Sequence, residues 1–167
     1  MTAVSLYSCQ TPIAADQHVD EYDIALFFQH EISKLKEENP TINKTVSNGK
    51  SSETKQVKIT DWNKELAHFA DLNLNKSANG FQKTIIGDTT VYSSSSENAK
   101  ERTIIKLVQK SESPDEITVY KELNNLLFKN QEQLYYKTNS LYEIIKRQKV
   151  KGMGENLYHI KGEIMKD

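Results

Sequence analysis

The second half of the chain limits the possible folds most strongly, because it contains a succession of short strand-like segments with no helical pattern between them. Apolar and polar residues alternate clearly at 117–120 (Ile-Thr-Val-Tyr) and at 158–161 (Tyr-His-Ile-Lys), which is the period of a half-buried strand. Strands that follow one another through short polar turns pair as an antiparallel meander. Seven strands are predicted, at residues 81–86, 89–93, 102–110, 116–123, 126–137, 141–150 and 156–164.

A helix is predicted near the start of the chain. Asp20 is expected to cap its first turn, and Asn39-Pro40 ends it because proline disfavours the helical conformation in the residue before it. Its apolar stripe is formed by Ile24, Phe27 or Phe28, Ile32 and Leu35.

A hairpin and a second helix follow. Residues 44–46 and 55–59 are expected to pair around Asn48-Gly49, which supplies the positive φ angles of a tight turn, although the polar residues 50–54 can widen the loop. Asp61 is expected to cap the second helix. The buried face of that helix is formed by Trp62, Leu66 and Phe69.

Together these elements predict an α+β fold, in which two N-terminal helices and a hairpin pack on a curved antiparallel meander of about seven strands. Such a sheet buries one face and leaves the other in water. Ile117, Val119, Tyr158 and Ile160 are expected to point toward the helices. His159 and Lys161 are expected to face water.

Length and charge restrict the domain count and the partners. With 167 residues, the chain is expected to form one domain, residues 19–167, after an N-terminal segment of residues 1–18. Lys and Arg number 22 against 23 Asp and Glu, so no global positive field attracts nucleic acid, and no nucleic-acid partner is expected.

The only cysteine, Cys9, lies in a sequence similar to the site at which bacterial lipoproteins are cut and acylated. Leu6 at minus three and Ser8 at minus one fit that pattern, whereas Tyr7 is bulkier than usual. Residues 1–18 are therefore interpreted as a signal remnant and tether, with Cys9 as the lipidation site and the membrane as a partner. Stable anchoring needs more than one acyl chain, and lipoprotein maturation supplies two or three.

Two interpretations of the N-terminus stay open. Only eight residues precede Cys9 and none is Lys or Arg, whereas a secretory signal has a basic segment followed by roughly 7–15 apolar residues. Either the true start lies upstream of Met1 and the protein is exported to the cell envelope, or the N-terminus is genuine and the protein is cytoplasmic with one free thiol.

Three segments resemble a group of short, uncharacterised envelope lipoproteins of Bacteroidota: Ser8-Cys9-Gln10, Lys44-Thr45-Val46 and residues 61–66. The C-terminal residues 158–162 also fit, so the resemblance spans most of the chain. It implies a lipoprotein of the bacterial cell envelope and supplies no catalytic residues. In that phylum acidic residues just after the Cys often mark export to the cell surface. Residues 10–13 are uncharged here, so the resemblance implies an outer-membrane position facing the periplasm.

No catalytic residue, metal site or cofactor is expected. The acidic Asp20, Glu21 and Asp23 lack the spacing and the Gly of a calcium loop. The serines at 93–96 form no nucleophile elbow, and the two glycines within 152–154 lack the third Gly of a phosphate loop. The histidines, expected to be solvated or singly hydrogen-bonded unless the fold assembles them into a site, are His18, His30, His68 and His159.

The leading functional hypothesis is a non-enzymatic envelope lipoprotein that acts as a scaffold or binding module, with a protein or an apolar ligand as its further partner. One alternative is a carrier of lipid or of a small apolar ligand, which a dry apolar slot would favour. Another is a soluble enzyme, which a deep pocket with several titratable side chains of perturbed pKa would favour.

Overall fold

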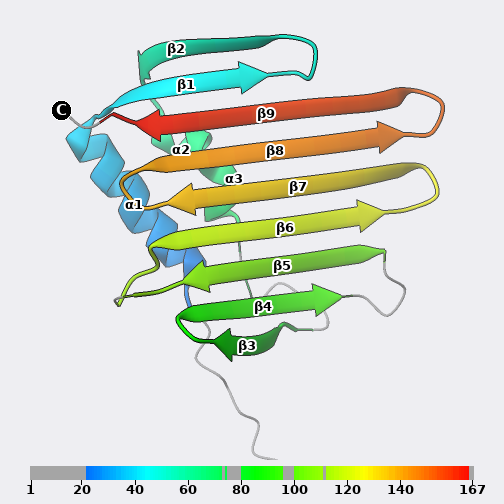
Figure 1. The fold of residues 1–167 in the computed structure, drawn as a ribbon, viewed down its shortest axis with the longest axis horizontal. Helices are drawn as coiled ribbons and strands as arrows, with labels where there is room; N and C mark the ends of the chain where they lie inside the picture. Colours follow the sequence, from blue (N-terminus) through cyan, green and yellow to red (C-terminus); the bar gives the residue numbers. More distant parts are fainter. Residues whose placement is uncertain (1–21, 73, 75–79, 96–99, 111, 166–167) are drawn as a thin grey trace, which may run out of the picture.

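One open antiparallel sheet forms the body of the protein. The structure, a computed structural model, describes residues 22–72, 74, 80–95, 100–110 and 112–165. Within them the strands are β1 (Thr41–Ser47), β2 (Ser52–Lys58), β3 (Gln82–Ile86), β4 (Thr89–Ser95), β5 (Glu101–Val108), β6 (Glu116–Asn124), β7 (Phe128–Lys137), β8 (Leu141–Val150) and β9 (Gly154–Ile164). Their spatial order is β2-β1-β9-β8-β7-β6-β5-β4-β3, so β2 and β3 are the two edges (Figure 1).

The predicted meander is confirmed, but the predicted role of the hairpin is wrong. All seven expected strands form, as β3 to β9, and each pairs with the next along the chain. The hairpin β1–β2 does not pack on this sheet; it extends it, because β1 pairs with the last strand, β9. Ile42 lies opposite Ile164, and Val46 lies opposite Ile160. The apolar alternation of β1 therefore matches that of β9, which would otherwise leave a long unpaired edge.

The loop of this hairpin is wider than a two-residue turn. Ser47 pairs with Ser52, which leaves four residues in the loop. The Asn48 side chain organises it by accepting hydrogen bonds from the backbone N–H groups of Lys50 and Ser51, at 3.0 and 2.9 Å. Only Gly49 takes a positive φ there, of 82°. The Asx hydrogen bonds thus replace the tight turn that the Asn-Gly pair predicts.

The helices contain the predicted apolar stripes, but their boundaries differ in part from the predicted ones. α1 (Ile24–Glu38) begins at Asp23, whose carboxylate accepts from Leu26 N at 2.8 Å, whereas the predicted cap, Asp20, lies outside the described residues. Asn39 ends α1 in the left-handed conformation, with φ of 44°. The single helix predicted after Asp61 is instead two short helices, α2 (Trp62–Glu65) and α3 (Ala67–Ala70).

The break between α2 and α3 lies at Leu66, whose φ and ψ are −101° and 14°. This change of direction lets three large side chains reach the core together, and Trp62, Leu66 and Phe69 are all fully buried. The prediction of these three as core residues is therefore confirmed. The Asp61 cap is also confirmed, because its carboxylate accepts from Lys64 N at 3.1 Å.

The core lies between the helices and one end of the sheet. Figure 1 shows α1, α2 and α3 behind the strands at the end where β8 begins. Two rows of buried side chains cross the central strands, and each row consists of residues that lie opposite one another in the register. The first row is Leu107, Ile117, Tyr136 and Tyr142, and the second is Ile105, Val119, Leu134 and Ile144. The Phe28 ring of α1, the Phe69 ring of α3 and the Tyr136 ring of β7 meet within 5.0–5.8 Å of one another.

Buried tyrosines of the sheet are hydrogen-bonded to the helices. Tyr136 Oη donates to Glu31 Oε2 of α1 at 2.5 Å, and Tyr142 Oη donates to Glu65 Oε1 of α2 at 2.7 Å. Burial, together with these carboxylates, raises the pKa of both phenols. Each hydroxyl thus stays protonated and satisfies a carboxylate that the helix brings to the core.

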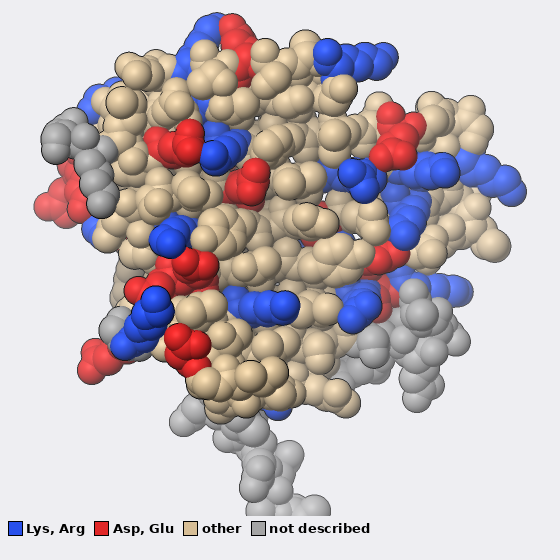
Figure 2. All heavy atoms as spheres, viewed as in Figure 1, with Lys and Arg blue, Asp and Glu red and all other residues tan. Residues whose placement is uncertain are grey.

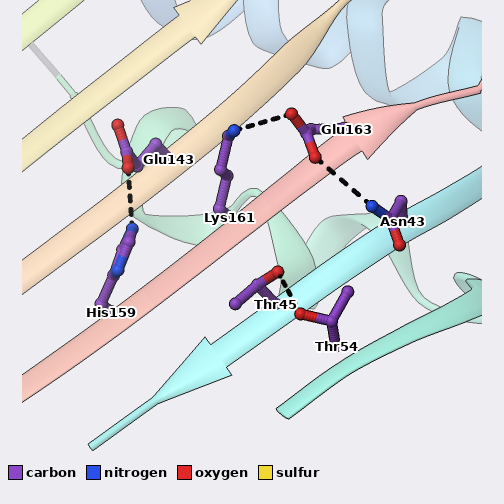
Figure 3. A network of polar contacts seen from close by, with 7 residues as sticks. All are labelled: Asn43, Thr45, Thr54, Glu143, His159, Lys161 and Glu163. Carbon is purple, nitrogen blue, oxygen red and sulfur yellow. Dashed lines mark hydrogen bonds and ion pairs between the residues drawn. The ribbon is translucent and has the colours of Figure 1, made fainter. Parts of the chain in front are cut away.

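The opposite face of the sheet carries a polar network, and its exposure differs from the prediction. His159 Nε2 bonds Glu143 Oε1 at 2.7 Å, and Lys161 Nζ donates to Glu163 Oε1 at 2.7 Å (Figure 3). Lys161 was expected to be mostly exposed, but only 35% of its side chain is. Cross-strand neighbours such as Thr45 and Glu143 shield its stem. Acidic and basic groups alternate over the rest of this face (Figure 2).

On the helix-facing side, Ile117 and Val119 are fully buried, as predicted, and Ile160 packs against the core while partly exposed. Tyr158 shares this face through its pairing with Lys146, yet it is exposed because it lies past the end of the helices. The predicted sheet with one buried and one water-facing side is therefore confirmed, although the helices cover a smaller area of it than the prediction implied.

Gly162→Ala should strongly destabilise the fold. Gly162 lies opposite Tyr142, and an added Cβ would overlap the phenol ring. The ring would have to leave its packing against Trp62 and its hydrogen bond to Glu65. We expect a loss of about 1–3 kcal/mol in urea unfolding, the range for adding a methyl group to a well-packed core.

A double-mutant cycle supplies the control for this prediction. In a Tyr142→Ala background the added methyl group meets free space, so Gly162→Ala should cost less than about 1 kcal/mol there. Equal costs in both backgrounds would mean that the Tyr142 ring does not occupy the space over Gly162.

Candidate functional site

The helix-facing side of the sheet continues past the helices as an open groove, in which charged and amide groups lie beside apolar surface. The register places two further rows of side chains there, beyond the buried rows. The nearer row is Thr103, Lys121, Glu132, Lys146 and Tyr158, and the farther row is Glu101, Leu123, Asn130, Gln148 and Asn156. These residues line a hollow of about 500 Å³. It is the candidate functional site, and we call it the groove.

Four charged or titratable side chains from four elements meet at the inner end of the groove, the end nearest the helices. Glu132 of β7 lies at the centre, with His68 Nδ1 of α3 at 3.1 Å from its Oε1. Lys121 Nζ of β6 lies 3.4 Å from its Oε2, and Lys146 Nζ of β8 lies 3.3 Å from its Oε1. Lys146 Nζ also lies 2.8 Å from His68 Nε2. We call these four residues the Glu132 cluster.

The contacts of His68 define which ring nitrogen carries the proton. A lysine ammonium can only donate, so His68 Nε2 accepts the hydrogen bond from Lys146. Nδ1 then carries the ring proton and donates it to the Glu132 carboxylate. Both ring nitrogens are therefore occupied, and His68 presents no free base to the groove.

The surroundings of Glu132 keep it ionised. Burial alone would raise the pKa of this carboxyl, but the hydrogen bond from His68 and the charges of Lys121 and Lys146 outweigh burial and lower the pKa to about 2. A carboxylate this acidic, with both oxygens engaged by cations, is an acceptor that positions its neighbours and does not act as a general acid.

Amide side chains form the outer floor of the groove. Asn130, Gln148 and Asn156 stand beside one another on three neighbouring strands. The Oδ1 atom of Asn130 is buried and finds no hydrogen-bond donor among the described residues. A buried carbonyl oxygen without a donor costs free energy.

A second hollow, of about 420 Å³, adjoins the groove on the side of β1 and α2. Tyr158 lines both hollows, so its side chain forms the boundary between them, whereas His68 lines the second hollow. Lys44, Lys58 and Lys64 surround the second hollow together with Asp61 and Glu65. Lys44 is engaged by Glu65, whose carboxylate lies 2.7 Å from its Nζ.

Among the described residues, the histidines lie apart and do not form a common site. His18 lies outside the described residues, His30 is exposed on α1, and His159 is on the opposite face of the sheet from His68. His68 was expected to make at most one hydrogen bond, but it makes two because α3 brings it over β7 and β8. Among the residues the structure describes, no three His, Cys, Asp or Glu side chains form a metal-binding group.

Two further sequence interpretations concern the N-terminus and the membrane. Cys9, the predicted lipidation site, lies outside the described residues. Among the described helices, none has the length and apolar character needed to cross a bilayer.

The groove residues were missed at the sequence level, although a signal was present. Side chains two apart on a strand share a face, so Lys121 continues the inward-facing series that begins with Ile117 and Val119. In the same way Glu132 shares its face with Leu134, and Lys146 with Ile144. A charge at an inward-facing position on each of three consecutive strands indicates a polar patch beside the core.

Comparison of the chain with protein families, with curated proteins and with solved structures gives no match. The groove must therefore be interpreted from its own geometry.

The acid stability of the fold should depend on Glu132. Because its pKa in the folded protein is about 2 and its ordinary value is 4.5, the carboxylate contributes stability above about pH 5, and this contribution is lost as the pH falls toward 2. Glu132→Gln removes that contribution. The difference in unfolding free energy between wild type and variant should therefore shrink between about pH 5 and pH 2.

Urea titrations at several pH values measure this difference, and Glu37→Gln, an exposed change on α1, serves as the matched control. The control should track the wild type at every pH. A constant difference between wild type and Glu132→Gln over the acid range would contradict the ion-paired state of Glu132.

Proposed function

We propose that this chain is a non-enzymatic binding module of the bacterial cell envelope, tethered through an acylated Cys9. Its groove binds a polar ligand that carries one anionic group, such as a carboxylate or phosphate, and several hydrogen-bonding groups. The observation that carries this proposal is the composition of the groove, in which amide side chains lie beside the charged Lys121, Glu132 and Lys146.

The preference for an anionic group follows from the charges at the inner end. Lys121 and Lys146 share the single carboxylate of Glu132, so this end of the groove carries an excess positive charge. About a third of each lysine side chain remains exposed, and each ammonium has donors beyond those used by Glu132. A ligand carboxylate or phosphate can therefore accept charge-assisted hydrogen bonds from both lysines.

The preference for further polar groups follows from the outer floor. Asn130, Gln148 and Asn156 have amide side chains, a type of group that both donates and accepts hydrogen bonds. Leu123 and the exposed Tyr158 flank this floor and supply apolar contact. A few placed polar groups beside apolar surface are typical of small-molecule sites.

The same features favour a binding module over the two alternatives. A lipid carrier needs a dry, enclosed apolar slot, whereas this groove is open to water and places charged and amide groups beside its apolar surface. An enzyme of the acid–base type needs a group that exchanges protons near neutral pH. In the Glu132 cluster the carboxylate is strongly acidic and the imidazole is bonded at both nitrogens.

Ligand binding should depend on Lys146. We expect small carboxylates and phosphates to shift the side-chain amide NMR signals of Asn130, Gln148 and Asn156 in ¹⁵N-labelled protein, and matched neutral compounds to shift them less. Lys146→Gln removes one charge-assisted hydrogen bond, so it should weaken binding of the anions about tenfold.

Lys106→Gln is the control, because Lys106 is exposed on the face of the sheet away from the helices, where it pairs in register with Val91 and Thr118. It should leave the binding unchanged. Equal binding by Lys146→Gln, or groove shifts produced by palmitate and not by the anions, would overturn the proposed ligand class.

The envelope location is tested through Cys9. Expressed in its native host with its own upstream codons, the protein should incorporate labelled palmitate and stay with the membranes after a high-salt wash. Cys9→Ala should lose the label, because the thiol accepts the diacylglyceryl group. An unlabelled wild-type protein, or a label retained by Cys9→Ala, would refute the tether.

A further inference from the structure

The β6–β7 and β8–β9 turns lie at the end of the sheet away from the helices, and they carry strongly exposed apolar side chains. Leu126, Leu127 and Met153 are 92%, 70% and 85% exposed. The two turns lie side by side, because Lys151 N donates to Leu127 O at 2.9 Å. The three apolar side chains therefore form one group, which we call the apolar tips.

The apolar tips are not needed to form the turns that carry them. Asn125 organises the β6–β7 turn, with its side chain accepting from Leu127 N and Phe128 N, each at 2.9 Å. Turn positions like these usually hold Gly or a short polar residue such as Asn, Asp or Ser. Two consecutive leucines there leave apolar surface in water without contributing to the core.

A basic collar surrounds the apolar tips. The collar consists of Lys129, Arg147, Lys149 and Lys151, with two Glu nearby, whereas the whole chain has a net charge of −1. Lys129 lies directly opposite Lys149, a like-charge pairing that costs stability. Within the described part of the chain, Lys149 and Lys151 make no ion pair, in contrast to Lys129, which bonds Glu122 at 2.8 Å. Figure 2 shows Lys and Arg side chains gathered at this end of the molecule.

We propose that the apolar tips insert into the surface of an anionic lipid bilayer, with the basic collar in contact with the headgroups. Apolar side chains beside a basic rim are what interfacial insertion requires, since burial of the tips and attraction to anionic lipids add. A protein partner fits less well, because three side chains offer far less area than the ~800 Å² per partner of a standard interface.

This docking sets an orientation for the domain on the membrane. The groove lies at the same end of the sheet as the tips, since Leu123, next to the β6–β7 turn, lines it. Insertion of the tips brings the groove to the level of the headgroups. The inference does not depend on acylation of Cys9, and an unacylated chain should dock through the tips alone.

Vesicle flotation of the full chain tests the proposal, with Cys9→Ser so that no acyl chain contributes. We expect binding to phosphatidylcholine vesicles that contain about one quarter phosphatidylglycerol, and little binding to phosphatidylcholine alone, because anionic lipid recruits the collar. The triple variant Leu126→Ser, Leu127→Ser, Met153→Ser should bind at least about tenfold more weakly. Lys149→Gln with Lys151→Gln should weaken binding to the anionic vesicles in particular.

The matched control is Ile85→Ser with Ile86→Ser, which removes two exposed apolar side chains from the edge strand β3. It should bind as the parent does, and circular dichroism should show all variants to be folded. Binding that ignores lipid charge, or that survives the triple substitution, would overturn the proposal. So would an absence of flotation at low salt, or self-association that the triple variant abolishes, since the tips would then join two copies of the chain.

Discussion

The sheet is longer than the cover that the helices can provide, and much of the molecule follows from this mismatch. Strands β8 and β9 have 10 and 11 residues, so they extend over about 33–36 Å. A helix that crosses strands covers a strip only about 10 Å wide. α1 supplies one such strip and α2 with α3 a second beside it, as the contact of Phe28 with Phe69 shows. The rest of the face has no helix over it, and the inward-facing positions there hold mostly polar and charged residues.

The junction between covered and uncovered sheet is built from polar contacts that reach across the two layers. Tyr136 and Tyr142 bind helix carboxylates inside the core, and His68 binds Glu132 at its border. Gly162 contributes by being small, because the Tyr142 ring lies over it. The helices are thus held in register by specific hydrogen bonds as well as by apolar packing. This gives the inner end of the groove a fixed shape.

Local patterns in the sequence predicted more than the long-range arrangement did. Strand-like segments separated by polar turns located all seven strands of the meander, and the Asp61 cap and the Trp62 stripe were predicted correctly, because each depends on neighbouring residues. The pairing of β1 with β9 has no local signature, since many alternating strands could have matched that edge. The break at Leu66 depends on space in the core. Three members of the Glu132 cluster were detectable in the sequence, because they are charged residues at inward-facing positions of their strands. The fourth, His68, comes from a helix in the other layer of the structure.

The pairing of β1 with β9 also affects when the sheet can form during synthesis. Asn43 and Glu163, which bond across these strands, are 120 residues apart in the chain. As the ribosome releases the polypeptide from its N-terminus, β1 and β2 emerge long before the strand that completes their sheet. Contacts this distant in sequence carry a large loop-closure cost and slow folding. The β1 edge of the hairpin must therefore stay unpaired until β9 has been synthesised.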